Sequence, residues 1–396
     1  PEYEPEEKLG GRAGLQKLLR GIDDSGGKCL LFVNYNILDQ NTDWFKKDLY
    51  RYQQQDEYGT QAVWMAWGES TLMARKGLSV RRHLIGSIVP AFETLMEGYL
   101  LDRVRDGAHG FQIDKICVGS KLDLNPLNEL KPDVALCEGL VQAIRRLLEK
   151  CRAIKPDFCL ASEAGQDRLL PYIDVFYRNS HATSIAPLRY VFPEWTSCQH
   201  VSTPKDFNGV NGAVLTGSVI CVEPFEYQGS LGHPLYQELG RYIQEIERIR
   251  AKLADVIFLG RYYDTCGATI IATVRNPAEK AETKTLGAEV MIPPGGAQAT
   301  GGNAGGIAYR VHGHTGTDQR ATIIVNTSAQ PVEYQWQFTH RAVSKADLYV
   351  PFQPERTVGK GEPLTIDPET VHILVEQSNP QPRNPDESKP CLESSS

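Results

Sequence analysis

The sequence predicts an α/β protein in which a (β/α)8-type barrel is followed by an antiparallel β-sandwich. Over residues 1–265, apolar strand-like runs alternate with stretches of helical spacing, which is typical of parallel β/α units. So many units in series favour a barrel over an open sheet, and no glycine fingerprint for a dinucleotide follows any strand. Over residues 266–377, short alternating runs replace the helical spacing, which is typical of a β-sandwich.

The barrel elements are expected in the following order. Leu15, Leu18, Leu19 and Ile22 share one face of a first helix, and the apolar run at 28–36 follows as a buried strand. Further helices are expected after Pro90, over 136–151 and over 239–253. Further strands are expected at 107–119, 157–163, 172–178, 187–192 and 212–222.

The number of strands falls short of a complete barrel. Six strands are found up to Val222, or seven if the run at 61–67 joins them, whereas a barrel needs eight. No strand precedes the run at 28–36, so we expect a chain that lacks the first strands of its barrel. Such a barrel exposes unpaired strand edges, and self-association into a homo-oligomer is one way to cover them.

The second domain is expected over residues 266–377, packed on the barrel through the closing helix, with Leu253, Ile257 and Phe258 at the junction. Its strand-like runs lie at 268–274, 288–294, 307–313, 321–328, 332–338, 346–352 and 371–377. The glycine-rich stretch 293–306 lacks the Lys-Ser/Thr ending and the following helix of a P-loop, so it is predicted as a loop. The tail 378–396 is rich in Pro, Ser and charged residues and is predicted to be disordered.

Composition excludes two classes of partner. The chain has 396 residues, of which 41% are hydrophobic and 23% charged, and a net charge of −7. Binding to a nucleic-acid backbone needs clustered Lys and Arg, so no nucleic acid is expected. No apolar stretch approaches the roughly 20 residues that cross a bilayer, so no membrane partner is expected.

The nine cysteines show no disulfide or metal-site spacing. Cys29, Cys117, Cys159 and Cys221 lie in or beside strand-like runs, where a reduced cysteine packs as a small hydrophobic residue. We expect buried free thiols, which favours a cytoplasmic location. We expect neither a metal nor another cofactor.

Carboxylates end two neighbouring predicted strands, at the rim where barrel active sites lie. Asp114 and Glu163 are 163 − 114 = 49 positions apart, with one helix between them. Adjacent parallel strands lie roughly 4.8 Å apart, so the two carboxyls can approach to about 5–5.5 Å, the separation in a retaining glycosidase. In such an enzyme the ionised carboxylate attacks the anomeric carbon, and the protonated carboxyl donates its proton to the leaving oxygen. The Lys115 cation favours the ionised form of Asp114.

Other residues near the same strand ends are candidates for binding hydroxyls or stacking on a sugar. They are Asn34, Asn36, Trp67, Lys115, Arg178 and His181. Each has a structural alternative, because tryptophan is usually a core residue and polar loop residues are usually solvated. Asp114 can also form an ion pair with Lys115 or Arg178, and Glu163 can also cap the next helix.

The stretches 107–115, 159–178 and 187–195 together resemble a group of uncharacterised barrel proteins related to retaining α-glycoside hydrolases. More loosely, the chain is similar to the α-amylase superfamily and to endo-α-N-acetylgalactosaminidases. In those enzymes an Asp on the fourth barrel strand is the nucleophile and a Glu on the fifth is the acid/base. The resemblance therefore implies a TIM barrel with Asp114 as the nucleophile, Glu163 as the acid/base and a carbohydrate as the substrate.

The resemblance makes the run at 28–36 the third barrel strand, so that two strands precede Pro1. It departs from the amylase pattern at residues 178–184, where His181 is present without the Asp that would supply a third carboxylate. The expected activity is retaining hydrolysis of α-linked sugars in carbohydrate metabolism. The alternative is a non-catalytic carbohydrate-binding protein or a remnant barrel.

Overall fold

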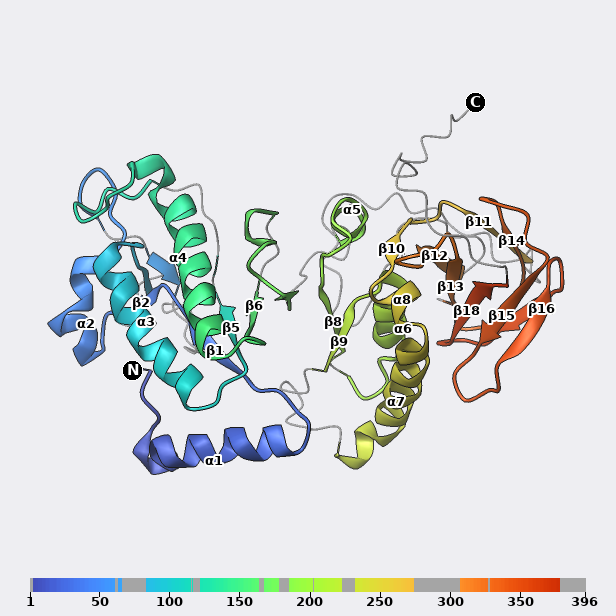
Figure 1. The fold of residues 1–396 in the computed structure, drawn as a ribbon, viewed down its shortest axis with the longest axis horizontal. Coiled ribbons are helices and arrows are strands. Elements are labelled where there is room, and N and C mark those ends of the chain that lie inside the picture. Colours follow the sequence, from blue (N-terminus) through green and yellow to red (C-terminus); the bar gives the residue numbers. More distant parts are fainter. Residues whose placement is uncertain are drawn as a thin grey trace. The chain divides into compact units, whose positions relative to one another are not determined.

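The computed structural model describes residues 3–60, 63–65, 83–114, 116, 122–163, 167–177, 185–201, 203–222, 232–273, 307–326 and 328–377. The chain forms two compact units, Pro1–Arg178 and Asn179–Ser396 (Figure 1). The domain boundary near residue 265, and the disordered tail, which lies outside the described residues, stay predictions.

The first unit holds one parallel sheet and the helices that connect its strands. Its elements are α1 (Gly11–Asp24), β1 (Leu30–Asn34), β2 (Ile37–Asp39), α2 (Asp43–Lys47), β3 (Val63–Met65), β4 (His83–Ile85), α3 (Pro90–Arg105), β5 (Gly110–Asp114), α4 (Pro132–Ile154), β6 (Cys159–Ser162) and β7 (Val175–Phe176). Short 3-10 helices lie at Glu7–Leu9, Leu49–Tyr52 and Asp167–Leu169.

The parallel sheet has the order β1-β5-β6-β7. One face of the sheet is fully covered, because its residues Val33, Phe111, Ile113 and Leu160 are all nearly inaccessible. Gly110 lets the strands approach at the start of β5, since a Cβ there would lie 2.3 Å from the Cys159 carbonyl oxygen. This sheet confirms the expected parallel β/α units.

An insertion separates β1 from α3. It contains α2 and a small antiparallel sheet with the order β2-β4-β3. The run at 61–67, considered above as a seventh barrel strand, contributes β3, which pairs antiparallel with β4. It therefore belongs to the insertion.

Helices α3 and α4 are joined by two ion pairs one helical turn apart. Arg146 donates three hydrogen bonds to Glu93, at 2.5 Å, 2.7 Å and 3.0 Å, and Lys150 binds Glu97. The expected apolar face of α4 is confirmed, because Leu136, Leu140, Ile144, Leu147, Leu148 and Cys151 are buried. Helix α3 leads from β1 to β5 and α4 leads from β5 to β6, so these ion pairs help to fix the three strands relative to one another.

The second unit begins with parallel β/α structure and continues into two antiparallel sheets. Its elements are α5 (Ile185–Val191), β8 (Cys198–Val201), α6 (Phe207–Thr216), β9 (Val219–Val222), α7 (Gln237–Lys252), α8 (Ala254–Ile257), β10 (Arg261–Tyr262), β11 (Ala268–Thr273), β12 (Ile307–Gly313), β13 (Arg320–Asn326), β14 (Val332–Phe338), β15 (Lys345–Tyr349), β16 (Arg356–Gly359), β17 (Leu364–Ile366) and β18 (Val371–Glu376). A short 3-10 helix lies at Pro234–Tyr236.

Two sheets form the β-sandwich. Their orders are β10-β12-β13-β18-β15-β16 and β11-β14-β17, and all their pairings are antiparallel. One core lies between the sheets, and a second core packs α6, α7 and α8 on β12, β13 and β18. Leu253 and Ile257 belong to the second core, as expected for the junction. The predicted run at 288–294 and the glycine-rich loop lie outside the described residues.

One expected strand is wrong, and the strand expected at 212–222 is confirmed only over β9, Val219–Val222. Of residues 187–192, expected to form a strand, 187–191 fall in helix α5, and residues 212–216 form the end of α6 rather than the start of a strand. Periodicity cannot separate a short apolar strand from one or two turns of buried helix. The strand β8, which pairs in parallel with β9, was not predicted.

The barrel is not closed among the described residues. Four parallel strands form one sheet and two form another, rather than a ring of eight. The fold class is therefore mixed α/β with an antiparallel β domain, as predicted, but the eight-stranded ring is not present in the described part of the chain.

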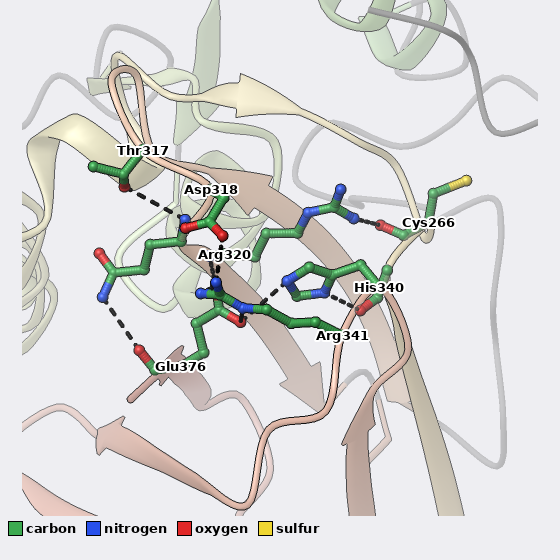
Figure 2. A network of polar contacts seen from close by, with 9 residues as sticks. Cys266, Thr317, Asp318, Arg320, His340, Arg341 and Glu376 are labelled. Carbon is green, nitrogen blue, oxygen red and sulfur yellow. Dashed lines mark hydrogen bonds and ion pairs between the residues drawn. The ribbon is translucent and has the colours of Figure 1, made fainter. Parts of the chain in front are cut away.

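A buried carboxylate at the end of the interior strand β18 holds several segments of the sandwich together (Figure 2). Glu376, which ends β18, receives the Arg341 guanidinium at 2.5 Å and 3.1 Å and the backbone N–H of Arg320 at 2.5 Å. His340 Nε2 lies 3.1 Å from the same carboxylate. These contacts tie the end of β18 to the segment between β14 and β15, so the cluster is structural.

Candidate active site

The carboxyl ends of the four parallel strands bring polar side chains to one level. Asn34 pairs with Asp114 in the register of β1 and β5. Ile113 pairs with Ser162, and the Glu163 N–H donates to the Ile113 carbonyl, so Glu163 is the next residue level with Asp114. Tyr177 continues the row beyond β7, because its N–H donates to the Ser162 carbonyl. The row is therefore Asn34, Asp114, Glu163 and Tyr177.

These four residues share one face of the sheet, because residues aligned on parallel strands point the same way and alternate along each strand. The same face carries Phe32, which is 60% exposed, whereas its neighbour Val33 on the opposite face is 2% exposed. Asp114 itself is only 6% exposed. The row thus lies on the more open face of the sheet.

Tyr3 lies beside this row. Its hydroxyl donates to the carbonyl of Asn34. Burial raises the pKa of Tyr3, and the negative charge of Asp114 raises it further. Asp114 therefore acts on Tyr3 as a nearby anion, and the Tyr3 phenol stays protonated beside it.

A buried Arg holds Tyr3 in this position. Arg103 of α3 is 5% exposed and donates to the Tyr3 carbonyl at 3.1 Å. The same nitrogen forms an ion pair with Glu4 at 3.3 Å. The other guanidinium nitrogen lies 3.0 Å from Asp106. The N-terminal segment is thus fixed to the end of α3, and through Tyr3 to β1.

The segment after β5 is also anchored. Asp123 is 1% exposed and accepts the hydroxyl of Ser87. The side chain of Asn125 donates to the carbonyls of Arg51 and Gln53, each at 2.8 Å. These bonds tie the approach to α4 to the insertion that follows β1.

A cavity of about 290 Å³ opens at the end of β1. Phe32, Trp44 and Tyr3 supply aromatic rings to its lining, and Asn34, Asp39 and Thr42 supply polar groups. Tyr99 holds the indole of Trp44 edge-on, with ring centroids 5.3 Å apart. The cavity therefore combines aromatic walls with hydrogen-bonding groups beside the row.

The structure brings together only some of the residues predicted for the site. Asp114, Glu163 and Asn34 lie in the row, whereas Asn36 is 3% exposed and does not line the cavity. The remaining predicted residues lie outside the described residues; they are Trp67, Lys115, Arg178 and His181. Tyr3 and Trp44 were missed, since neither follows an expected strand end.

Two further features bear on the chemistry. In the described ranges, no group of three or more His, Cys, Asp or Glu side chains is arranged to hold a metal ion. None of the described helices combines the length and apolar character of a membrane span.

Neither a family model nor a curated protein matches the sequence. Solved structures do match the fold. An α-amylase from Anoxybacillus has 11% sequence identity and a TM-score of 0.59, with 95% of this chain and 81% of that chain covered.

Two further structures agree. An α-amylase from Geobacillus thermoleovorans, solved with acarbose, has 13% identity and a TM-score of 0.57, with 96% of this chain and 84% of that chain covered. A trehalose-6-phosphate hydrolase from Bacillus licheniformis has 11% identity and a TM-score of 0.58, with 96% and 88% covered. The chain therefore shares the fold of these glycoside hydrolase structures, and the resemblance drawn from its strand-end motifs is confirmed at the level of the fold.

Proposed function

We propose that the chain is a retaining glycoside hydrolase acting on α-linked sugars, with Asp114 as the nucleophile and Glu163 as the acid/base. The observation that carries the proposal is the register, since both residues end adjacent parallel strands at one level and on one face. This arrangement suits a retaining mechanism, in which the two carboxyls lie about 5–5.5 Å apart. Amylases and a trehalose-6-phosphate hydrolase share the fold, which supports the reaction class.

The reaction then has two steps. The Asp114 carboxylate attacks the anomeric carbon while the bond to the glycosidic oxygen breaks, and Glu163 gives its proton to that oxygen. Water next attacks the same carbon, Glu163 takes the proton from the water, and the bond to Asp114 breaks. The sugar keeps its anomeric configuration, both carboxyls return to their starting states and no cofactor is consumed.

The remaining predicted residues belong to the proposal as substrate-binding groups. Asn34 stands next to Asp114 in the row, and Lys115 follows Asp114 in the sequence, where its positive charge favours the ionised carboxylate. The others proposed to bind substrate are Asn36, Trp67, Arg178 and His181. The proposed catalytic domain spans residues 1–265.

A screen of p-nitrophenyl α- and β-glycosides tests the activity. Asp114→Ala is expected to lower kcat by at least about 10³-fold, because it removes the carboxylate proposed to form the covalent intermediate. Asp24→Ala, which removes an exposed carboxylate on α1, is the matched control and is expected to be as active as the wild type. Full activity of Asp114→Ala would rule out the proposed nucleophile.

Azide separates the two roles. In Glu163→Ala, azide is expected to restore turnover of p-nitrophenyl substrates and to give a glycosyl azide with the configuration of the substrate, because Asp114 still forms the intermediate. In Asp114→Ala, azide attacks directly and the product is inverted. Glu57→Ala, an exposed position, is the control for Glu163→Ala. Sugar binding without hydrolysis of any glycoside would favour the non-catalytic alternative.

A further inference from the structure

We infer that the cavity at the end of β1 is a subsite for a single pyranose ring, with Trp44 as its stacking wall, Tyr3 as its cover and Asn34 as a hydrogen-bonding group for a sugar hydroxyl. The inference rests on the proposed function for the identity of the ligand as a sugar. It assigns roles to Tyr3 and Trp44, which belong to neither the catalytic pair nor the predicted binding residues.

The walls of the cavity suit a sugar. Aromatic faces pack on the apolar C–H faces of a pyranose, and Phe32, Trp44 and Tyr3 all line the cavity. Phe32 is 60% exposed, which is unusual for a strand residue of an apolar sheet and leaves its ring available to a ligand. The edge-on contact with Tyr99 fixes the plane of the Trp44 indole before any ligand arrives.

Polar groups stand among these rings. Within the described residues, the Oδ1 atom of Asn34 is buried and accepts no hydrogen bond from the protein. Buried polar atoms normally have a partner, so this atom is able to accept a hydrogen bond from a ligand. Asp39 adds a carboxylate to the lining, and one of its oxygens accepts the N–H of Asn41 at 3.0 Å. Sugar hydroxyls are the donors that such acceptors bind.

The size of the cavity sets the length of the ligand. Its volume of about 290 Å³ is close to the lower end of the range of small-molecule sites, roughly 300–1,000 Å³. One pyranose ring fits this volume better than a longer chain of sugars.

The position of the cavity links it to the catalytic pair. Asn34 lines the cavity and is the register partner of Asp114. Tyr3 also lines the cavity and is close enough to sense the charge of Asp114. A ring bound here lies next to the proposed nucleophile.

Titration of the full chain carrying Asp114→Asn tests binding without turnover. The probes are methyl α-D-glucopyranoside, methyl α-D-galactopyranoside and N-acetylgalactosamine, with affinity measured by calorimetry. We expect at least one probe to bind, and the further change Trp44→Ala to weaken its binding about tenfold or more. Trp44→Phe keeps an aromatic wall and is expected to stay within about threefold. Tyr58→Ala removes an aromatic ring that is 84% exposed and does not line the cavity, and is expected to change nothing.

The outcomes separate this inference from the proposed function. Binding that depends on Trp44 in a chain that hydrolyses no glycoside supports the subsite and contradicts the enzyme. Hydrolysis by the wild type with kcat/KM unchanged by Trp44→Ala supports the enzyme and overturns the subsite. Failure of all three probes to bind also overturns the subsite. If Trp44→Ala does not fold, Tyr3→Ala changes the same cavity from the terminal segment, and unchanged affinity in that variant overturns the inference.

Discussion

His109 connects three segments at the amino ends of the parallel strands. Its Nδ1 atom accepts the N–H of Cys29 at 3.2 Å, which places the proton of the neutral ring on Nε2. Nε2 lies 2.9 Å from the Asp23 carboxylate at the end of α1. The residue is 3% exposed and lies at the opposite end of the strands from Asp114, so its contacts contribute to stability rather than to the proposed catalysis.

This contact predicts a dependence of stability on pH. The hydrogen bond from His109 lowers the pKa of Asp23 below its ordinary value of 3.8. A lowered carboxyl pKa means that the ionised form stabilises the fold above pH 3.8, and that this stability is lost as the pH falls through the folded-state pKa. Asp23→Asn is therefore expected to lower the Tm near neutral pH and to match the wild type in strong acid. Asp24→Asn, at the next and exposed position, is the control.

Some residues of the candidate site could be predicted from the ends of the expected strands, and others could not. Asp114 and Glu163 were found because each ends an apolar run, and the register of β5 and β6 puts them level. Trp44 and Tyr3 could not be found in this way. Trp44 lies in the short helix α2, and Tyr3 lies in a polar segment whose position depends on Arg103, 100 residues away in the sequence.

At the scale of elements, two ion pairs hold α3 and α4 together, Arg146–Glu93 and Lys150–Glu97, and in each the glutamate is more buried than the basic residue. The Glu93 side chain is 10% exposed and that of Arg146 is 36% exposed. Hydrogen bonding to Glu93 raises the pKa of Arg146, so the Arg146 guanidinium is charged at neutral pH. The helical spacing of the sequence placed the apolar face of α4 but gave no sign that Arg146 faces α3.

Removal of this pair is expected to be costly. Arg146→Ala leaves the Glu93 carboxylate largely buried without its partner, so we expect a loss of about 1–3 kcal/mol in the free energy of unfolding, between the values for exposed and buried pairs. Arg145→Ala breaks an exposed pair with Glu149 at 3.8 Å, and is expected to cost less than about 0.5 kcal/mol. Urea denaturation of both variants provides the measurement. Equal losses would show that burial of Glu93 does not matter.

At the scale of the molecule, the antiparallel domain completes the core of the helices before it. Leu253 and Ile257 pack in one cluster with Ala308, Ile323 and Ile373 of β12, β13 and β18. The sequence placed these helical residues at the junction between two domains. The structure shows that α6, α7 and α8 share a core with the sandwich, within one compact unit.

This shared core predicts the result of truncation. A chain ending at residue 265 exposes the apolar face of α6, α7 and α8, and we expect it to self-associate because exposed patches of this kind drive association. Size-exclusion chromatography and binding of a hydrophobic dye measure the effect. Removal of residues 378–396 alone is the control and is expected to leave the elution unchanged. A monomeric 1–265 chain that binds no dye would contradict the shared core.

The sequence by itself determined the type of most long elements, the change from β/α units to antiparallel strands and the two strand-end carboxylates. These features depend on local periodicity and on the burial of apolar strand and helix residues, which the order of apolar residues records. Tertiary structure alone decided that 187–191 is helical, that 63–65 joins an antiparallel insertion and that Tyr3 and Trp44 line a cavity together with Asn34. Each of these depends on contacts between segments far apart in the chain, and local residue order does not specify such contacts.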